Sequence, residues 1–78
     1  MKLLEVISPL YKEFGEEREK RKIEYINPEY ITRIRTAEHW TGVSCTEIMV
    51  QDAMLYTFSD YRDIETIVKL IKELNDEK

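Results

Sequence analysis

Five short stretches of the chain have the residue pattern of β-strands. Each is five to seven residues long, and most alternate apolar with polar positions, which places one set of side chains on each face of a sheet. Asn27-Pro28 ends the second stretch, because proline has no N–H to donate to a β-ladder. The predicted strands are residues 3–7, 22–26, 32–36, 45–51 and 54–58.

The central feature is a predicted β-hairpin over residues 32–51. Its expected loop, residues 36–43, contains the only histidine, His39, and the only tryptophan, Trp40, together with Gly42, one of only two glycines. The other strands are expected to pair with this hairpin. The loop therefore gathers the rarest side chains of the chain at one point.

The apolar period changes from that of a strand to that of a helix after residue 58. Ser59 or Asp60 is a suitable N-cap, because its side-chain oxygen can accept a free N–H of the first turn. Apolar residues then recur at helical spacing. The predicted buried stripe is Ile64, Ile67, Val68, Ile71 and Leu74.

These elements predict an α+β fold in a single domain of residues 1–78. We expect a small antiparallel sheet of four to five strands, with one C-terminal helix packed on one face. The expected core includes Thr32, Ile34, Ile48 and Val50, with Tyr25, Tyr56 and Phe58. The opposite face of the sheet is expected to carry Arg33, Arg35, Cys45, Glu47, Met49 and Leu55.

Residues 8–22 form a charged insert between the first two predicted strands. Ser8, Pro9 and Gly15 fit the N-cap, first turn and end of a short helix, but the same segment also alternates as an extended chain would. Residues 16–22 are seven consecutive charges, which predicts a solvated loop or, alternatively, a charged recognition loop. The pattern leaves helix, strand and disordered loop open.

Composition narrows the classes of function. The chain has 78 residues and a net charge of −4, which disfavours general binding to nucleic acid or to anionic membranes, since both depend on positive charge. A single cysteine excludes a disulfide framework within one chain and fits a reducing cytoplasm. We expect no signal peptide and no membrane span. A small core with many apolar residues favours a homo-oligomer.

The order of elements resembles that of the FlbD/SwrD-like small proteins of bacterial flagella and swarming. The resemblance rests on the Ile-Asn-Pro turn at residues 26–28, the Thr-Glu-Ile strand at residues 46–48 and the acid-capped helix at residues 63–68. It departs from the family at the insert of residues 8–21 and at residues 52–53, where the family has Asn-Gly or Asp-Gly. The resemblance implies a flagellar accessory role and supplies no catalytic residues.

No set of residues fits a catalytic, metal or cofactor site. His39 and Cys45 could act as base and nucleophile, but nucleophilic catalysis also needs an orienting group and a cleft. One histidine and one cysteine do not make a zinc pattern, and Gly15 and Gly42 are too isolated for a phosphate loop. We therefore expect a protein that is not an enzyme and that has no cofactor.

Trp40 is the most informative single residue. It could fold back over Ile34 or Ile48, or it could remain exposed as an anchor in an interface, where Trp, Tyr and Arg dominate the binding energy. The candidate partner-binding or ligand-binding residues are Tyr30, Arg33, Arg35, His39 and Trp40.

The leading hypothesis is a non-catalytic interaction protein. It would be an accessory or inhibitor of the phage or mobile-element type that binds a larger host or bacterial protein with a basic surface. One alternative is a homo-oligomer that binds a small anionic, nucleotide-like ligand, because arginine and aromatic side chains together suit such a ligand. The other alternative is the flagellar accessory role.

Overall fold

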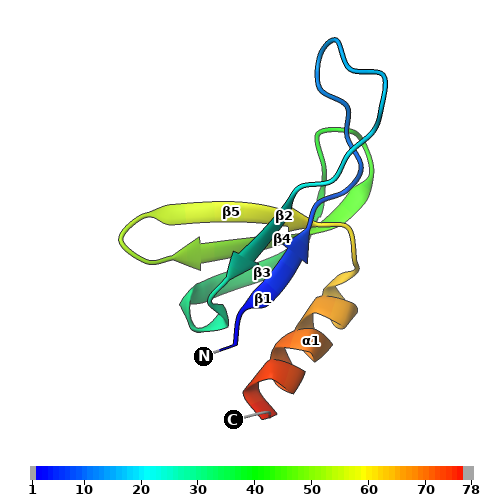
Figure 1. The fold of residues 1–78 in the computed structure, drawn as a ribbon. Helices are drawn as coiled ribbons and strands as arrows, with labels where there is room; N and C mark the ends of the chain where they lie inside the picture. The colour runs from blue at the N-terminus through cyan, green and yellow to red at the C-terminus, as the bar shows by residue number, and fades with distance from the viewer. Residues whose placement is uncertain (1, 77–78) are drawn as a thin grey trace.

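The computed structural model describes residues 2–76 and contains five β-strands and one α-helix in that range (Figure 1). In chain order the elements are β1 (Leu4–Ile7), β2 (Ile23–Ile26), the 3₁₀ turn η1 (Pro28–Tyr30), β3 (Ile31–Glu38), β4 (Ser44–Gln51), β5 (Leu55–Asp60) and α1 (Ile64–Asp76). This confirms an α+β fold with a C-terminal helix. The strands form two antiparallel sheets, β1–β2 and β3–β4–β5, in place of the single sheet of four to five strands that was predicted.

Hydrogen bonds join the two sheets where the end of β5 reaches the end of β1. Tyr61 donates its N–H to the carbonyl of Ile7 at 2.9 Å. The N–H of Ile7 goes to the Asp60 carboxylate, Oδ2, at 2.8 Å. Because a side chain takes a donor that a β-ladder would use, β1 and β5 do not continue into one sheet.

Asp60 is fully buried and is the centre of a polar cluster. Its Oδ1 accepts from the N–H of Arg62 at 2.8 Å and from Arg62 Nε at 2.9 Å, and its Oδ2 accepts from Arg62 Nη2 at 2.8 Å. Arg62 Nη2 also donates to the carbonyl of Glu5, and the carbonyl of Arg62 accepts from the hydroxyl of buried Thr46. Both β-sheets and the start of the helix region are thus tied to one carboxylate.

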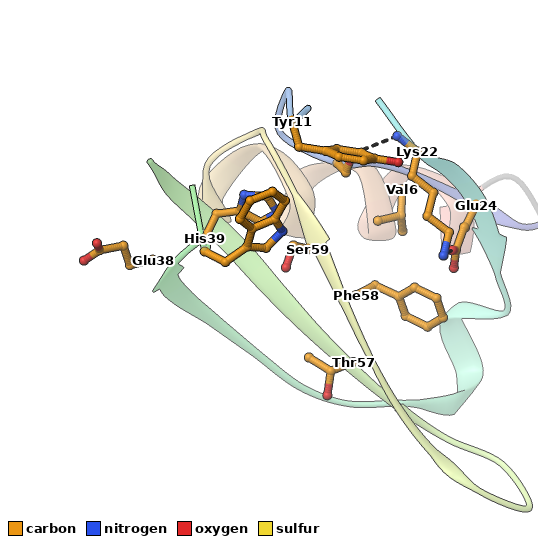
Figure 2. Close-up of a pocket in the computed structure, with 11 residues that line it drawn as sticks. Val6, Tyr11, Lys22, Glu24, Glu38, His39, Thr57, Phe58 and Ser59 are labelled. Carbon is orange, nitrogen blue, oxygen red and sulfur yellow. Dashed lines mark hydrogen bonds and ion pairs between the residues drawn. The ribbon is translucent and has the colours of Figure 1, made fainter. Parts of the chain in front are cut away.

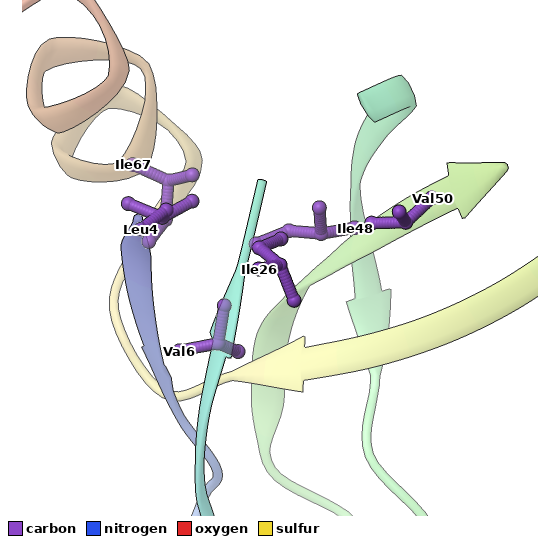
Figure 3. Close-up of a cluster of buried hydrophobic side chains, with 6 residues drawn as sticks. All are labelled: Leu4, Val6, Ile26, Ile48, Val50 and Ile67. Carbon is purple, nitrogen blue, oxygen red and sulfur yellow. The ribbon is translucent and has the colours of Figure 1, made fainter. Parts of the chain in front are cut away.

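The hydrophobic core lies between the two sheets and the helix (Figure 3). Its buried members come from four elements, namely Leu4, Val6, Ile26, Ile48, Val50 and Ile67. Ile34 and Phe58 are half-buried and pack against this cluster. The core positions predicted at Ile34, Ile48, Val50 and Phe58 are therefore confirmed.

The predicted core position at Thr32 is wrong. The β3–β4 register shifts between Ile31 and Arg33, so that Ile31 lies opposite Val50 and Thr32 is the extra residue of a bulge. Ile31 packs against the core, whereas Thr32 is exposed. The bulge reverses the face on which the first residues of β3 lie.

Two of the three predicted core aromatics are also wrong. Tyr25 lies on the outer face of the β1–β2 sheet, where its hydroxyl donates to Glu5 at 3.0 Å. Tyr56 is exposed near the β4–β5 turn, which projects away from α1 (Figure 1). Tyr56 has the expected alternation with Phe58, but the elements that cover the core do not extend over that end of the sheet.

The α1 helix begins at Ile64, and Asp63 caps it. Asp63 Oδ1 accepts the N–H of Thr66 at 2.8 Å. The predicted cap at Ser59 or Asp60 is wrong, because β5 continues through Asp60 and its carboxylate is bound to Ile7 and Arg62. The predicted stripe is buried at Ile67 and half-buried at Ile64, Ile71 and Leu74, whereas Val68 is exposed.

Residues 8–22 are an extended arm that prolongs the β1–β2 hairpin. Ser8 and Lys22 are joined by two hydrogen bonds, and Tyr11 and Lys20 exchange main-chain bonds of 3.0 and 2.8 Å. Gly15 has a φ of +86° at the end of the arm, a conformation that glycine adopts without a steric cost. The extended interpretation of this segment is confirmed, and the charged residues around its tip are solvated.

We predict that Asp60→Ala lowers the free energy of unfolding by about 2–4 kcal/mol, because it leaves the N–H of Ile7 and the half-buried Arg62 side chain without their acceptor. This is a large part of the total stability expected of a small domain. Urea denaturation followed by circular dichroism measures the change. Asp52→Ala, in the exposed β4–β5 turn, is the matched control and should change stability little. Equal stability of the two variants would contradict the role given to Asp60.

We also predict a pH dependence that comes from Asp63. Hydrogen bonds from Thr66, through its hydroxyl and its N–H, lower the pKa of Asp63 below its ordinary value of 3.8. A lowered pKa in the folded state means that the ionised carboxylate stabilises the fold above pH 3.8, and that this contribution is lost as the pH falls through the lowered pKa.

The measurement compares denaturation of the wild type and Asp63→Asn across this pH range. Asparagine retains a capping oxygen but has no charge to titrate. The stability difference between the two proteins should be present at neutral pH and should shrink in acid. A difference that does not vary with pH would show that the Asp63 charge is not involved.

Candidate binding site

The turn that carries Trp40 is shorter than predicted. β3 and β4 pair as far as Glu38 and Ser44, so the predicted loop of residues 36–43 is too long at its start. The N–H of His39 donates to the carbonyl of Val43, and the N–H of Gly42 donates to the carbonyl of His39, both at 2.8 Å. Gly42 has a φ of +94°, which fits the left-handed position of a three-residue hairpin loop. The turn is therefore tight and holds Trp40 at its tip.

Trp40 remains exposed although it has ordered neighbours. Its side chain is 73% exposed, which excludes burial over Ile34 or Ile48. Its ring lies edge-on to Tyr11, with centroids 6.2 Å apart, and beside His39 at 5.4 Å. Figure 2 shows Tyr11 of the arm and His39 of the turn on neighbouring sides of the same pocket. The arm and the β3–β4 turn lie at the same end of the molecule (Figure 1), and Tyr11, His39 and Trp40 form an aromatic cluster there.

The five predicted site residues do not form one surface. Tyr30 precedes β3 and Trp40 follows it, and an eight-residue strand separates its ends by roughly 25 Å. Arg33 and Arg35 lie opposite Met49 and Glu47 on the outer face of the sheet, as predicted, and Arg35 Nε is paired with Glu47 Oε1 at 2.7 Å. Arg33 and Arg35 thus share the outer face, whereas His39 and Trp40 share the turn, where Tyr11 contacts Trp40.

A groove of about 350 Å³ lies beside this aromatic cluster (Figure 2). Three parts of the chain line it. The β1–β2 hairpin and its arm contribute Val6, Ser8, Tyr11, Lys22 and Glu24, the end of β3 and the following turn contribute Glu38, His39 and Trp40, and β5 contributes Thr57, Phe58 and Ser59. We call this the hairpin groove.

Sequence reasoning missed Tyr11, the arm and the edge of β5 as parts of the site. The alternation of residues 8–15 did indicate an extended segment, but alternation does not say which other segment a strand will lie against. Tyr11 and Trp40 are 29 positions apart in the chain. Only the packing of the two hairpins brings their rings into contact.

The charges around the hairpin groove are mixed. Lys22 Nζ is paired with Glu24 Oε1 at 2.7 Å, and this hydrogen bond raises the pKa of Lys22. Within residues 2–76, Glu38 has no ion-pair partner. His39 Nδ1 lies 2.7 Å from Thr41 Oγ1, inside the turn. The Glu38 side chain points away from the other lining residues (Figure 2). The groove therefore offers an aromatic rim, an apolar floor and a lysine that is already paired.

Cys45 is not arranged as a nucleophile for His39. It is buried on β4, and burial raises the pKa of its thiol. A raised pKa keeps the thiol protonated and weakly reactive at neutral pH. Among the described residues no hydrogen bond joins Cys45 to His39, whose ring nitrogen bonds Thr41.

Comparison of the chain with family models, with curated proteins and with solved structures found no match. In the described part of the chain, no helix has the length and apolar character needed to cross a membrane. In the same range, no three or more His, Cys, Asp or Glu side chains are grouped so that they could hold a metal ion. The geometry of the hairpin groove is therefore the basis for the function proposed below.

Trp40 is the only tryptophan, so its fluorescence reports on this surface alone. We predict an emission maximum close to that of the urea-unfolded protein and ready quenching by acrylamide, because the indole is mostly in water. Tyr11→Ala should increase quenching further, since it removes the edge contact, while Tyr30→Ala should not. A blue-shifted, protected emission in the wild type would contradict an exposed Trp40.

Proposed function

We propose that this chain is a non-catalytic interaction protein that binds a larger bacterial protein through the hairpin groove and Trp40. An accessory or inhibitor role of the phage or mobile-element type fits this activity, by analogy with the profile of such proteins. The observation that carries the proposal is an exposed tryptophan held in place by Tyr11 and by a closed turn.

A binding anchor must be both exposed to solvent and already positioned, and Trp40 has both properties. A large apolar ring in water gains free energy when a partner covers it, and tryptophan is enriched among residues that dominate interfaces. A ring that is already positioned loses less conformational entropy on binding. The net charge of −4 would favour a basic partner surface through electrostatic steering.

A small anionic ligand is less well supported by this site. Glu24 and Glu38 line the hairpin groove, and its one lysine, Lys22, is already paired with Glu24. Arg35 lies on another face and is paired with Glu47. Among the described residues that line the groove, an anion would meet no cationic side chain that lacks an acidic partner, so we do not propose a nucleotide-like ligand.

The flagellar accessory role implied by the FlbD/SwrD resemblance would be one case of the proposed binding. The groove would then receive a flagellar or regulatory protein. No feature of the groove favours that partner over another bacterial protein. Self-association of the chain likewise remains a prediction, which light scattering tests.

The test compares capture of proteins from a bacterial lysate by immobilised wild type, Trp40→Ala and Tyr30→Ala. Tyr30 is the matched control, because it is an aromatic residue with 43% exposure at the opposite end of β3. We expect wild type and Tyr30→Ala to retain the same protein, and Trp40→Ala to bind it roughly 30-fold more weakly, as for an interface hot spot. Unchanged capture by Trp40→Ala, in a variant that circular dichroism shows to be folded, would overturn the proposal.

A further inference from the structure

One edge of β5 is open, and its main-chain groups border the hairpin groove. β5 is hydrogen-bonded to β4 and to no other strand among the described residues. Thr57, Phe58 and Ser59 line the groove. In an antiparallel strand, alternate residues direct both their N–H and their C=O to the same side. Every second residue of β5 therefore directs its main-chain groups toward the groove.

The closing bond of the β3–β4 hairpin sets this alternation. His39 bonds Val43, so Val43 and every second residue after it direct their main-chain groups toward β3. The residues between, including Thr46 and Ile48, direct theirs toward β5. Their register partners Asp60 and Phe58 direct theirs back toward β4. Thr57 and Ser59 are left facing the open edge.

An independent contact gives the same assignment. Tyr61 donates its N–H away from β4, to the carbonyl of Ile7 in β1. Counting back by two residues from Tyr61 gives Ser59 and Thr57 on that same side. The single bond at Tyr61 closes the end of this edge, and the preceding residues lie along the groove without a partner strand.

We infer that the hairpin groove receives an extended segment of the partner protein, which pairs with the open edge of β5 as an added strand. This inference rests on the proposed function and specifies the partner of the same site. Open edges with free N–H and C=O groups are templates for such pairing, and strand addition is a recurrent mode of peptide recognition. The bonds at Thr57 and Ser59 would provide affinity, and the groove side chains would provide specificity.

The net charge of the chain and the aromatic rim favour a basic segment. The net charge of −4 attracts positive charge, and Lys22 in the groove lining is already paired with Glu24. A lysine or arginine of the segment would lie close to the indole ring of Trp40, where a cation is favoured. Alternating apolar residues would meet the floor at Val6 and Phe58.

A single segment fits this edge better than a second copy of the chain. The edge lies in a groove between the arm and the Trp40 turn, and pairing of two identical edges would require both to project. The volume of about 350 Å³ is at the small end of ligand sites, which run from roughly 300 to 1,000 Å³. It suits a short extended peptide, not a folded surface.

The test uses fluorescein-labelled synthetic peptides and fluorescence anisotropy. Three sets are compared: peptides that alternate valine with lysine or arginine, peptides that alternate valine with glutamate, and basic peptides with the apolar spacing of a helix. We expect the alternating basic set to bind most tightly. Preference for the acidic or the helical set, or no binding by any set, would overturn the inference.

Main-chain pairing is tested by removing N–H donors, first from the peptide and then from the protein. Peptides N-methylated at alternate residues, in the two possible phases, should show a loss of roughly tenfold or more in one phase and little loss in the other, because the altered amides face β5 in only one of them. If both N-methylated peptides bound as tightly as the unmodified peptide, strand addition would be excluded. This measurement leaves the protein unchanged.

In the protein, Thr57→Pro removes an N–H that β4 does not use, so the β4–β5 ladder should survive. Thr57→Ala is the matched control, because it shortens the side chain and retains the N–H. We expect the proline variant to bind the basic peptide roughly tenfold more weakly than the alanine variant. Equal binding by the two folded variants would overturn the inference.

The outcomes separate this inference from the proposed function. If Trp40→Ala abolishes lysate capture but Thr57→Pro does not weaken it, the chain is a binding protein that does not use strand addition. If light scattering shows a dimer that Thr57→Pro dissociates, the edge pairs with a second copy and the inference is wrong. If both variants lose capture and the wild type is a monomer, the result supports both the proposed binding function and strand addition at β5.

Discussion

The Asp60 carboxylate is the interaction on which the rest of the structure depends. It is completely buried, and its oxygens accept from Ile7 in β1 and from Arg62 after β5. A buried charge is tolerated only when it is paired and fully hydrogen-bonded. That requirement determines where β1, β5 and the start of α1 lie relative to one another, because each must supply or support a donor. The small apolar core between them is then enclosed.

The same interaction accounts for the open edge of β5. Ile7 gives its N–H to Asp60, so β1 cannot pair further along β5, and the β1–β2 hairpin diverges from the three-stranded sheet. The space left between them becomes the hairpin groove, and the arm that prolongs the hairpin brings Tyr11 to Trp40. Structural support and the proposed binding surface thus have a common origin. A chain that extended β1 along β5 would have a continuous sheet and no groove.

Much of the fold could be predicted because it depends on local pattern. Alternation located the strands, the change of period located the helix, and the faces of β4 were correct from Cys45 to Val50. The failures have separate physical causes. Thr32 falls in a bulge that shifts the register, and Tyr56 lies where nothing covers the sheet. Asp60 accepts hydrogen bonds from distant Ile7 and from Arg62 and does not cap the helix. Each cause involves residues that are far apart in the chain.

The amino-acid sequence by itself determined the α+β class, the aromatic turn around Trp40 and the acidic balance of the surface, because these follow from residue types and their spacing. Only the tertiary structure decided that there are two sheets, that Tyr30 and Trp40 lie at opposite ends of β3, and that Tyr11 and the edge of β5 belong with Trp40. The physical reason is that a groove is made by segments that pack side by side, and a periodic pattern specifies the face of a strand but not its neighbour.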